Sequence, residues 1–235
     1  MIETNGIPII EKGSGKPLIL LHGFLCSKEY FATQINFFSR YRKVVAYDLY
    51  GFGKNVAKGP YTLQDYANEF CVVAKNYGEK VDVIAHSFGC RVVLKSALSC
   101  NLIDRAVLCG VAGLKPAFSI KREIKKRAYK VCKPFMKREK AEKRFFSSDY
   151  NALSSVMKVT FKQVVSEYLD DSLPKINIPT LAVFGENDKE TPPKIANKLI
   201  AKMPNCEKYI MNGCGHFCYA ERPNEFNHVV KEFLL

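Results

Sequence analysis

The sequence predicts an α/β fold, with a mostly parallel central sheet flanked by helices. Through the middle and end of the chain, short apolar runs alternate with amphipathic stretches, which is typical of strand–helix units around a parallel sheet. These runs have the length of strands rather than of helices. Glycine and histidine residues at their ends also favour strands.

Six apolar runs are the candidate strands of the sheet. They are residues 17–23, 43–49, 81–87, 105–110, 180–187 and 206–213, the last with weaker alternation. The opening residues 2–11, with Asn5-Gly6 at the centre, are typical of a β-hairpin.

Helical spacing marks the stretches that follow most of these runs. The expected helices are residues 28–40, 63–77, 88–99, 191–203 and a last one from 223 to the end. Thr62 follows the turn signal Gly59-Pro60 and is the expected N-cap of the second helix. Thr191 is the expected N-cap before Pro192 and Pro193.

Residues 113–172 interrupt this rhythm, because they are rich in lysine and contain no strand-like run. We interpret them as a basic helical lid inserted into a core of residues 1–112 and 173–235. Residues 113–144 contain 13 Lys or Arg and three Glu, so they hold +10 of the net charge of +13. A solvated lid face is the simpler interpretation, and an anionic partner is the alternative. No nucleic-acid motif accompanies the charge.

The 235 residues suit one domain, and 47% of them are hydrophobic, as in globular proteins. No run approaches the roughly 18 apolar residues of a membrane span, and no signal peptide is visible. Nine scattered cysteines, an odd number, indicate free thiols in a reducing compartment, so we expect a cytoplasmic protein. Cys71 and two other cysteines in apolar runs are expected to be core residues.

The segment Ala85-His86-Ser87-Phe88-Gly89 joins a candidate strand to a candidate helix. It matches the G-x-S-x-G nucleophile elbow, with alanine in the first position. Small flanking residues allow the strained turn that exposes the serine at the carboxyl end of a sheet. We therefore expect Ser87 to be a nucleophile and the backbone N–H of Phe88 to face a developing oxyanion.

The segment His22-Gly23-Phe24 ends the first core strand, and a turn there can offer the N–H of Phe24 as the second oxyanion donor. For His22 itself we expect a structural hydrogen bond rather than a catalytic role.

Asp188 directly follows the candidate strand at residues 180–187, where a carboxylate can accept a hydrogen bond from an imidazole and orient it. Glu186 is a less suitable candidate, because it lies closer to that strand.

Four histidines occur in the chain, at positions 22, 86, 216 and 228. His86 adjoins Ser87 and cannot easily fold back onto it, and His228 lies in the predicted terminal helix. His216 stands in a glycine-containing loop after the last strand and is therefore the candidate general base. A zinc site at Cys214, His216 and Cys218 is disfavoured, because a second pair of ligands with zinc spacing is missing.

The order Ser, Asp, His, each just after a strand, resembles the α/β-hydrolase superfamily and its small lidded esterases. The resemblance covers nearly the whole chain except residues 113–172. It rests on residues 5–24, 47–55, 61–67, 85–89, 184–193 and 213–217. Two departures are Ala85 in place of the usual glycine and Asn55 where serine is frequent.

The resemblance implies the α/β-hydrolase fold and the catalytic roles of Ser87, Asp188 and His216. We expect hydrolysis of a small-molecule ester through an acyl-enzyme on Ser87, with no metal and no cofactor. Leu25 and Phe217 are candidate substrate-binding residues of an apolar pocket. A thioesterase, amidase, C–C bond hydrolase or cofactor-free perhydrolase could use the same groups, and a catalytically silent binding protein is the non-enzyme alternative.

Overall fold

The computed structural model describes residues 2–4, 6–78, 80–115 and 148–235. One eight-stranded sheet forms its centre, in the order β1-β2-β4-β3-β5-β6-β7-β8. The strands are β1 (Ile2–Thr4), β2 (Ile7–Lys12), β3 (Pro17–Leu21), β4 (Lys43–Tyr47), β5 (Val81–His86), β6 (Ile103–Cys109), β7 (Thr180–Gly185) and β8 (Cys206–Met211). β1 and β2 pair in antiparallel fashion, as does β2 with β4, and all other pairs are parallel.

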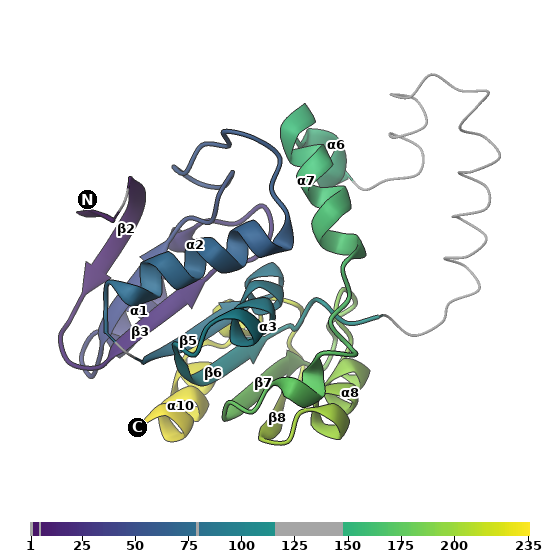
Figure 1. Cartoon of the computed structure of the whole chain (residues 1–235). Coiled ribbons are helices and arrows are strands. Elements are labelled where there is room, and N and C mark those ends of the chain that lie inside the picture. The colour runs from purple at the N-terminus through teal and green to yellow at the C-terminus, as the bar shows by residue number, and fades with distance from the viewer. Residues whose placement is uncertain (1, 5, 79, 116–147) are drawn as a thin grey trace.

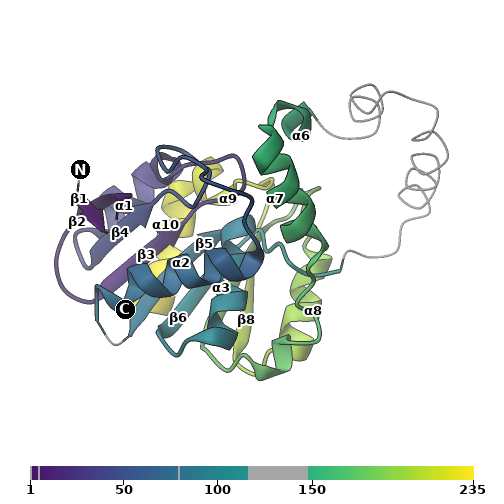
Figure 2. The ribbon, with the colours of Figure 1, turned by 45° about the horizontal axis from the view of Figure 1, so that its top comes forward.

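Helices cover both faces of this sheet (Figures 1 and 2). They are η1 (Lys28–Phe31), α1 (Ala32–Phe38), α2 (Leu63–Lys75), α3 (Phe88–Ser99), α6 (Ser148–Ala152), α7 (Ser155–Ser166), η3 (Leu173–Lys175), α8 (Lys194–Lys202), α9 (Cys218–Glu221) and α10 (Pro223–Leu234). The α/β-hydrolase fold predicted from the sequence is thus confirmed, including the hairpin and the six strands that follow it. The single helix expected at residues 28–40 is instead a 3-10 turn followed by a short α-helix.

Strand side chains alternate between two apolar layers, as the pleat of a sheet requires. In β3, Ile19 and Leu21 pack in the layer of α2, α3 and α8, whereas Leu18 and Leu20 pack in the layer of α1 and α10. Because β3 to β8 are parallel, their carboxyl ends meet at one edge of the sheet. All the candidate site residues follow strands that end there.

Helices α6 and α7 stand apart from the two layers, near that edge (Figures 1 and 2). Arg91 on α3 is buried and donates hydrogen bonds to the carbonyls of Val164 and Glu167 at the end of α7. On the other side, the Thr160 hydroxyl accepts a bond of 2.9 Å from the amide of Tyr61. The described part of the expected lid is therefore helical and anchored to the core.

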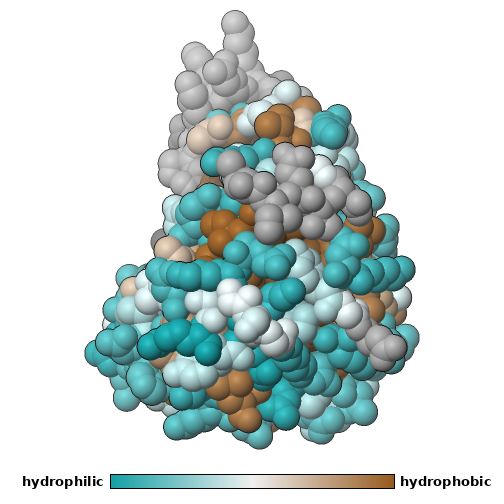
Figure 3. All heavy atoms as spheres, turned by 90° about the vertical axis from the view of Figure 1, so that its left-hand side faces the viewer, coloured by the Kyte–Doolittle hydropathy of each residue, from teal (hydrophilic) through white to brown (hydrophobic). Residues whose placement is uncertain are grey.

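The remainder of that expected lid, residues 116–147, lies outside the described residues, and with it all the Lys and Arg residues of 113–144 except Lys115. The interpretation of 113–172 as one basic lid stays a prediction. Within the part of the chain that the structure describes, no helix is long and apolar enough to cross a membrane. The face beside β2, shown in Figure 3, is mainly hydrophilic with separate hydrophobic patches.

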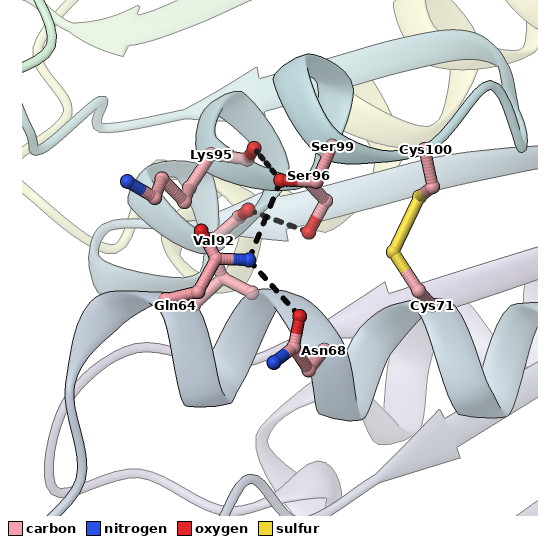
Figure 4. Close-up of a disulfide and its surroundings, with 8 residues drawn as sticks. All are labelled: Gln64, Asn68, Cys71, Val92, Lys95, Ser96, Ser99 and Cys100. Carbon is pink, nitrogen blue, oxygen red and sulfur yellow. Dashed lines mark hydrogen bonds between the residues drawn. A yellow bond between two sulfur atoms is a disulfide. The ribbon is translucent and has the colours of Figure 1, made fainter.

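The cysteines are not all free, contrary to the expectation from the sequence. Cys71 on α2 and Cys100, just after α3, form a disulfide with their Cα atoms 6.6 Å apart (Figure 4). The two cysteines are 29 residues apart in the sequence. The sequence could not indicate this pair, because their contact depends on how α2 and α3 pack together. The expected cytoplasmic location also rested on the absence of a visible signal peptide and membrane span; it stays a prediction, and the disulfide removes part of its support.

Replacing both Cys71 and Cys100 by serine is expected to destabilise the fold by about 3 kcal/mol, because the cross-link closes a 29-residue loop in the unfolded chain. Urea unfolding with and without a thiol reductant measures the change. Reductant should lower the midpoint of the wild type toward that of the double variant and leave the variant unaffected. Equal stabilities of the wild type and the double variant in the absence of reductant would contradict the prediction.

Candidate active site

Ser87 lies in the sharp turn between β5 and α3 that the sequence predicted. Its backbone has φ 50° and ψ −108°, a left-handed conformation that costs a non-glycine residue on the order of 1–3 kcal/mol. Gly89 permits the close approach of α3 to β3, since a Cβ there would lie 2.5 Å from the Leu21 carbonyl oxygen. Ala85, the departure from the family pattern, is fully buried in β5 and does not prevent the turn.

The loop after β3 passes directly against this serine. A Cβ on Gly23 would lie 2.9 Å from His86 Nδ1 and 3.4 Å from the Ser87 Cβ, so any larger residue there would have to displace the buried His86 ring. A turn closed by Cys26 N–H donating to the Gly23 carbonyl, at 3.2 Å, then carries Phe24 past Ser87. Phe88 is the first residue of α3, so its N–H has no acceptor within the helix. The two expected oxyanion donors therefore belong to the segments that flank Ser87.

His216 and Asp188 are brought together from the loops after β8 and β7. The His216 Nδ1 lies 2.8 Å from Asp188 Oδ2. Because an ionised carboxylate only accepts hydrogen bonds, Nδ1 carries a proton and Nε2 of the neutral ring is left as the acceptor. His216 and Ser87 line the same cavity, so both side chains border the space that a substrate would occupy.

The Asp188 carboxylate is held by three further donors. Its Oδ1 accepts the backbone N–H groups of Glu190 and Thr191 at 2.8 and 2.9 Å, and its Oδ2 accepts the Thr191 hydroxyl at 2.8 Å. Burial alone would raise the pKa of Asp188, but the hydrogen bonds from His216 and Thr191 outweigh it and hold the pKa below its usual value. Asp188 is thus kept ionised beside the imidazole.

Thr191 is a correction to the sequence interpretation. It does not cap the following helix, because α8 begins at Lys194 with Pro193 as its N-cap. Its hydroxyl instead binds Asp188 and lies 3.3 Å from His216 Nδ1. An Asp followed three residues later by Thr is a short-range turn signal that could have pointed to this contact.

A cavity of about 450 Å³ opens over these groups. The described residues that line it are Gly23, Phe24, Leu25, Cys26, Tyr30, His86, Ser87, Tyr150, Leu153, Phe161, Glu190, His216 and Phe217. Leu25 and Phe217, the candidate substrate-binding residues, are both among them. Phe88 does not line it and packs edge-on against Phe24 at 5.4 Å. Tyr150, Leu153 and Phe161 bring α6, α7 and the turn between them to the cavity.

His86 has a role that the sequence reasoning missed. Its side chain is buried, and the ring contacts His216, Phe217 and Tyr219 at centroid distances of 4.7 to 4.9 Å. Burial lowers the pKa of His86 to about 3, so the ring is neutral, and its Nε2 lies 3.0 Å from the His216 carbonyl oxygen. His86 thereby anchors the backbone of the loop that carries His216. Strand alternation, which directs residue 86 away from the face of Ala85, was the available signal.

The other two histidines do not line this cavity, and His22 has the structural role expected of it. His22 is buried, which lowers its pKa to about 4, and its Nδ1 donates to the Gly23 carbonyl while Nε2 accepts from Leu49 N–H at 3.0 Å. His228 lies exposed on α10. Among the described residues, no group of three His, Cys, Asp or Glu side chains could hold a metal ion.

A second cavity of about 450 Å³ lies beside α2, and Glu69 is buried in its wall. Burial raises the pKa of Glu69 to about 8, although its oxygens accept bonds from Tyr50 N–H and the Asn55 amide at 3.2 and 3.0 Å. Asn55, the second departure from the family pattern, therefore supports a buried carboxyl group. Its amide also donates to the Asp48 carbonyl.

This raised pKa predicts a pH dependence of stability. Between about pH 4.5 and pH 8 the folded state keeps a proton on Glu69 that the unfolded chain has lost, so its contribution to stability falls as pH rises. Glu69→Gln removes the titration, and the melting temperature of the variant relative to wild type should increase from pH 5 to pH 8. A difference that stays constant over this range would contradict the prediction.

The comparisons with known proteins identify the family of this chain. The model of the alpha/beta hydrolase family matches residues 18–229, so the chain belongs to the α/β-hydrolase family. It is 27% identical to a 2-hydroxy-6-oxo-6-(2'-aminophenyl)hexa-2,4-dienoic acid hydrolase of Metapseudomonas resinovorans, over 96% of this chain and 86% of that protein. It is 22% identical to a putative esterase/lipase of Haemophilus influenzae, over 92% and 82%.

Among solved structures, the chain resembles a serine hydrolase involved in carbazole degradation. The TM-score is 0.77 at 25% identity, covering 98% of this chain and 95% of the other. The likeness extends over the whole fold, including the strands whose carboxyl ends carry Ser87, Asp188 and His216.

Proposed function

We propose that this α/β hydrolase cleaves carboxylic ester bonds of a small molecule through an acyl-enzyme on Ser87. The observation that carries the proposal is the His216–Asp188 pair, joined at 2.8 Å, at a cavity that Ser87 also lines. A serine on a strained turn, an imidazole and an orienting carboxylate together form the arrangement of nucleophilic acyl transfer.

In this mechanism, Ser87 Oγ attacks the ester carbonyl carbon while Nε2 of His216 takes its proton. Negative charge develops on the carbonyl oxygen, and the backbone N–H groups of Phe24 and Phe88 stabilise it, each by about 3 kcal/mol. The imidazolium stays paired with Asp188, then protonates the departing alcohol. Water, deprotonated by His216, attacks the acyl-enzyme and releases the acid. No step uses a metal or cofactor.

The cavity supports an ester substrate of moderate hydrophobicity. Aromatic and aliphatic side chains form most of its described lining, and α6 and α7 contribute Tyr150 and Phe161. These two rings pack on each other at 5.3 Å, and Phe161 also contacts Phe24 beside Ser87. The preference of the enzyme for a given acyl-chain length should therefore depend on how well the acyl group fits between helices α6 and α7 and the loop after β3.

C–C bond hydrolysis is the second candidate. The relative from Metapseudomonas resinovorans, which matches over 96% of the chain, is named as the hydrolase of a 2-hydroxy-6-oxo-dienoic acid, and hydrolysis of such an acid breaks a C–C bond. The same serine, histidine and oxyanion donors could serve either reaction. The charge of the described cavity lining favours the ester, since it includes the carboxylate of Glu190 and no Lys or Arg to receive an acid.

The two candidates are separated by a substrate panel with the purified chain. p-Nitrophenyl esters of two to twelve carbons, a thioester, an anilide and a 2-hydroxy-6-oxo-dienoic acid are compared by kcat/KM. The proposal expects the highest value for an ester of short or medium chain length. A dienoic acid cleaved faster than every ester would replace it with C–C hydrolysis, and the thioester and anilide test the remaining alternatives in the same way.

A further inference from the structure

Glu190 occupies an unusual place in the candidate active site. It stands between Asp188 and Thr191, and its backbone N–H is fixed by the 2.8 Å bond to Asp188 Oδ1. Its side chain extends into the mouth of the cavity, where Oε2 lies 3.5 Å from His216 Nε2. That nitrogen is the atom that exchanges a proton with Ser87 in the proposed mechanism. The carboxylate therefore borders the space that a bound acyl group must enter.

No positive charge within the described structure balances this carboxylate. The His216 imidazole, neutral in the tautomer described above, lies within salt-bridge distance of it, and no Lys or Arg of the described residues does. Among the described residues that line the cavity, Glu190 is also the one Asp, Glu, Lys or Arg. The side chain is 69% exposed, so water weakens its field but does not remove it at distances of a few ångströms.

The rest of the described lining suits a cation better than an anion. Five aromatic residues face the cavity: Phe24, Tyr30, Tyr150, Phe161 and Phe217. Aromatic faces attract ammonium groups through their quadrupole, and a nearby carboxylate strengthens that attraction. An acyl group that carries its own carboxylate would be repelled by Glu190 at the mouth of the cavity. It would also find no Lys or Arg among the described lining residues to pair with.

We propose that Glu190 is a specificity-determining residue that makes this site select uncharged and cationic esters and reject esters whose acyl group carries a carboxylate. The inference rests on the proposed ester hydrolysis and deepens it by naming the charge class of the substrate. Glu190 acts through its charge on the bound substrate, whereas Asp188 keeps the separate task of orienting His216.

The test uses three p-nitrophenyl esters of similar length with the full chain: the neutral pentanoate, the anionic glutarate monoester and the cationic 4-(trimethylammonio)butyrate. In the wild type, kcat/KM should be highest for the cationic or the neutral ester and about tenfold or more lower for the anionic one. Glu190→Gln should reduce the neutral-to-anionic ratio of kcat/KM by about tenfold, and added salt should narrow the wild-type ratio.

The matched control is Glu207→Gln, an equal change of charge at an exposed position near the amino end of β8, on the opposite edge of the sheet. It should leave both kcat/KM values and their ratio unaltered. An unchanged ratio in Glu190→Gln, or a wild type that prefers the anionic ester, would overturn the inference while leaving ester hydrolysis intact. Absence of Ser87-dependent hydrolysis of all three esters would instead remove the proposed function itself.

Discussion

Replacing Ser87 by alanine is expected to lower kcat/KM for p-nitrophenyl esters by about 10⁴-fold or more, because the acyl-enzyme cannot form without the hydroxyl. The oxyanion donors and the cavity remain, so a small rate above the uncatalysed reaction should persist. Alanine tolerates the backbone at φ 50° no better and no worse than serine, so the melting temperature should change little. Initial rates and thermal unfolding of the same preparations measure both effects.

A fluorophosphonate probe gives an independent measurement of the same assignment. It should label the wild type at one site, identified by mass spectrometry as Ser87, and should not label Ser87→Ala. Ser99→Ala, an exposed serine at the end of the same helix, is the matched control and should be labelled and active like the wild type. Equal ester hydrolysis by wild type and Ser87→Ala would exclude the mechanism, and equal rates at the uncatalysed level would favour a binding protein.

The fold was predictable because its signals are local. Each buried strand of a parallel sheet is a short apolar run, so the boundaries of β3, β4, β5, β7 and β8 lie close to the predicted runs. The elbow at Ser87 needs small neighbours that are visible in the sequence. Asp188 and His216 could be named because parallel strands place their carboxyl ends together, which converts position after a strand into position in space.

What the sequence could not supply depends on side-chain orientation and on packing between distant elements. A threonine before two prolines predicts a helix cap, yet the Thr191 hydroxyl binds Asp188. The position of His86 beside Ser87 argues against a catalytic role, and its ring instead binds the backbone carbonyl of His216. No signal in the sequence distinguishes Glu190, because its importance depends on the position of its carboxylate near His216 Nε2.

The hydrogen bonds around Asp188 make a sharp prediction for Asp188→Asn. Oδ1 accepts two backbone N–H groups, so the amide oxygen of asparagine should take that position and turn its NH₂ toward His216. An N–H donor facing Nδ1 requires that nitrogen to be unprotonated, which moves the ring proton to Nε2. Nε2, which takes the serine proton in the proposed mechanism, would then be a donor and could not accept that proton.

We therefore expect Asp188→Asn to lower kcat by about 10³- to 10⁴-fold with a much smaller change in KM, since substrate contacts are untouched. Glu186→Gln is the control, because Glu186 is the neighbouring acid and its carboxylate binds Gly213 N–H rather than the imidazole. It should keep kcat within about threefold of wild type. If Asp188→Asn retained a tenth of the activity, or if Glu186→Gln lost as much, the orienting carboxylate would have to be sought elsewhere.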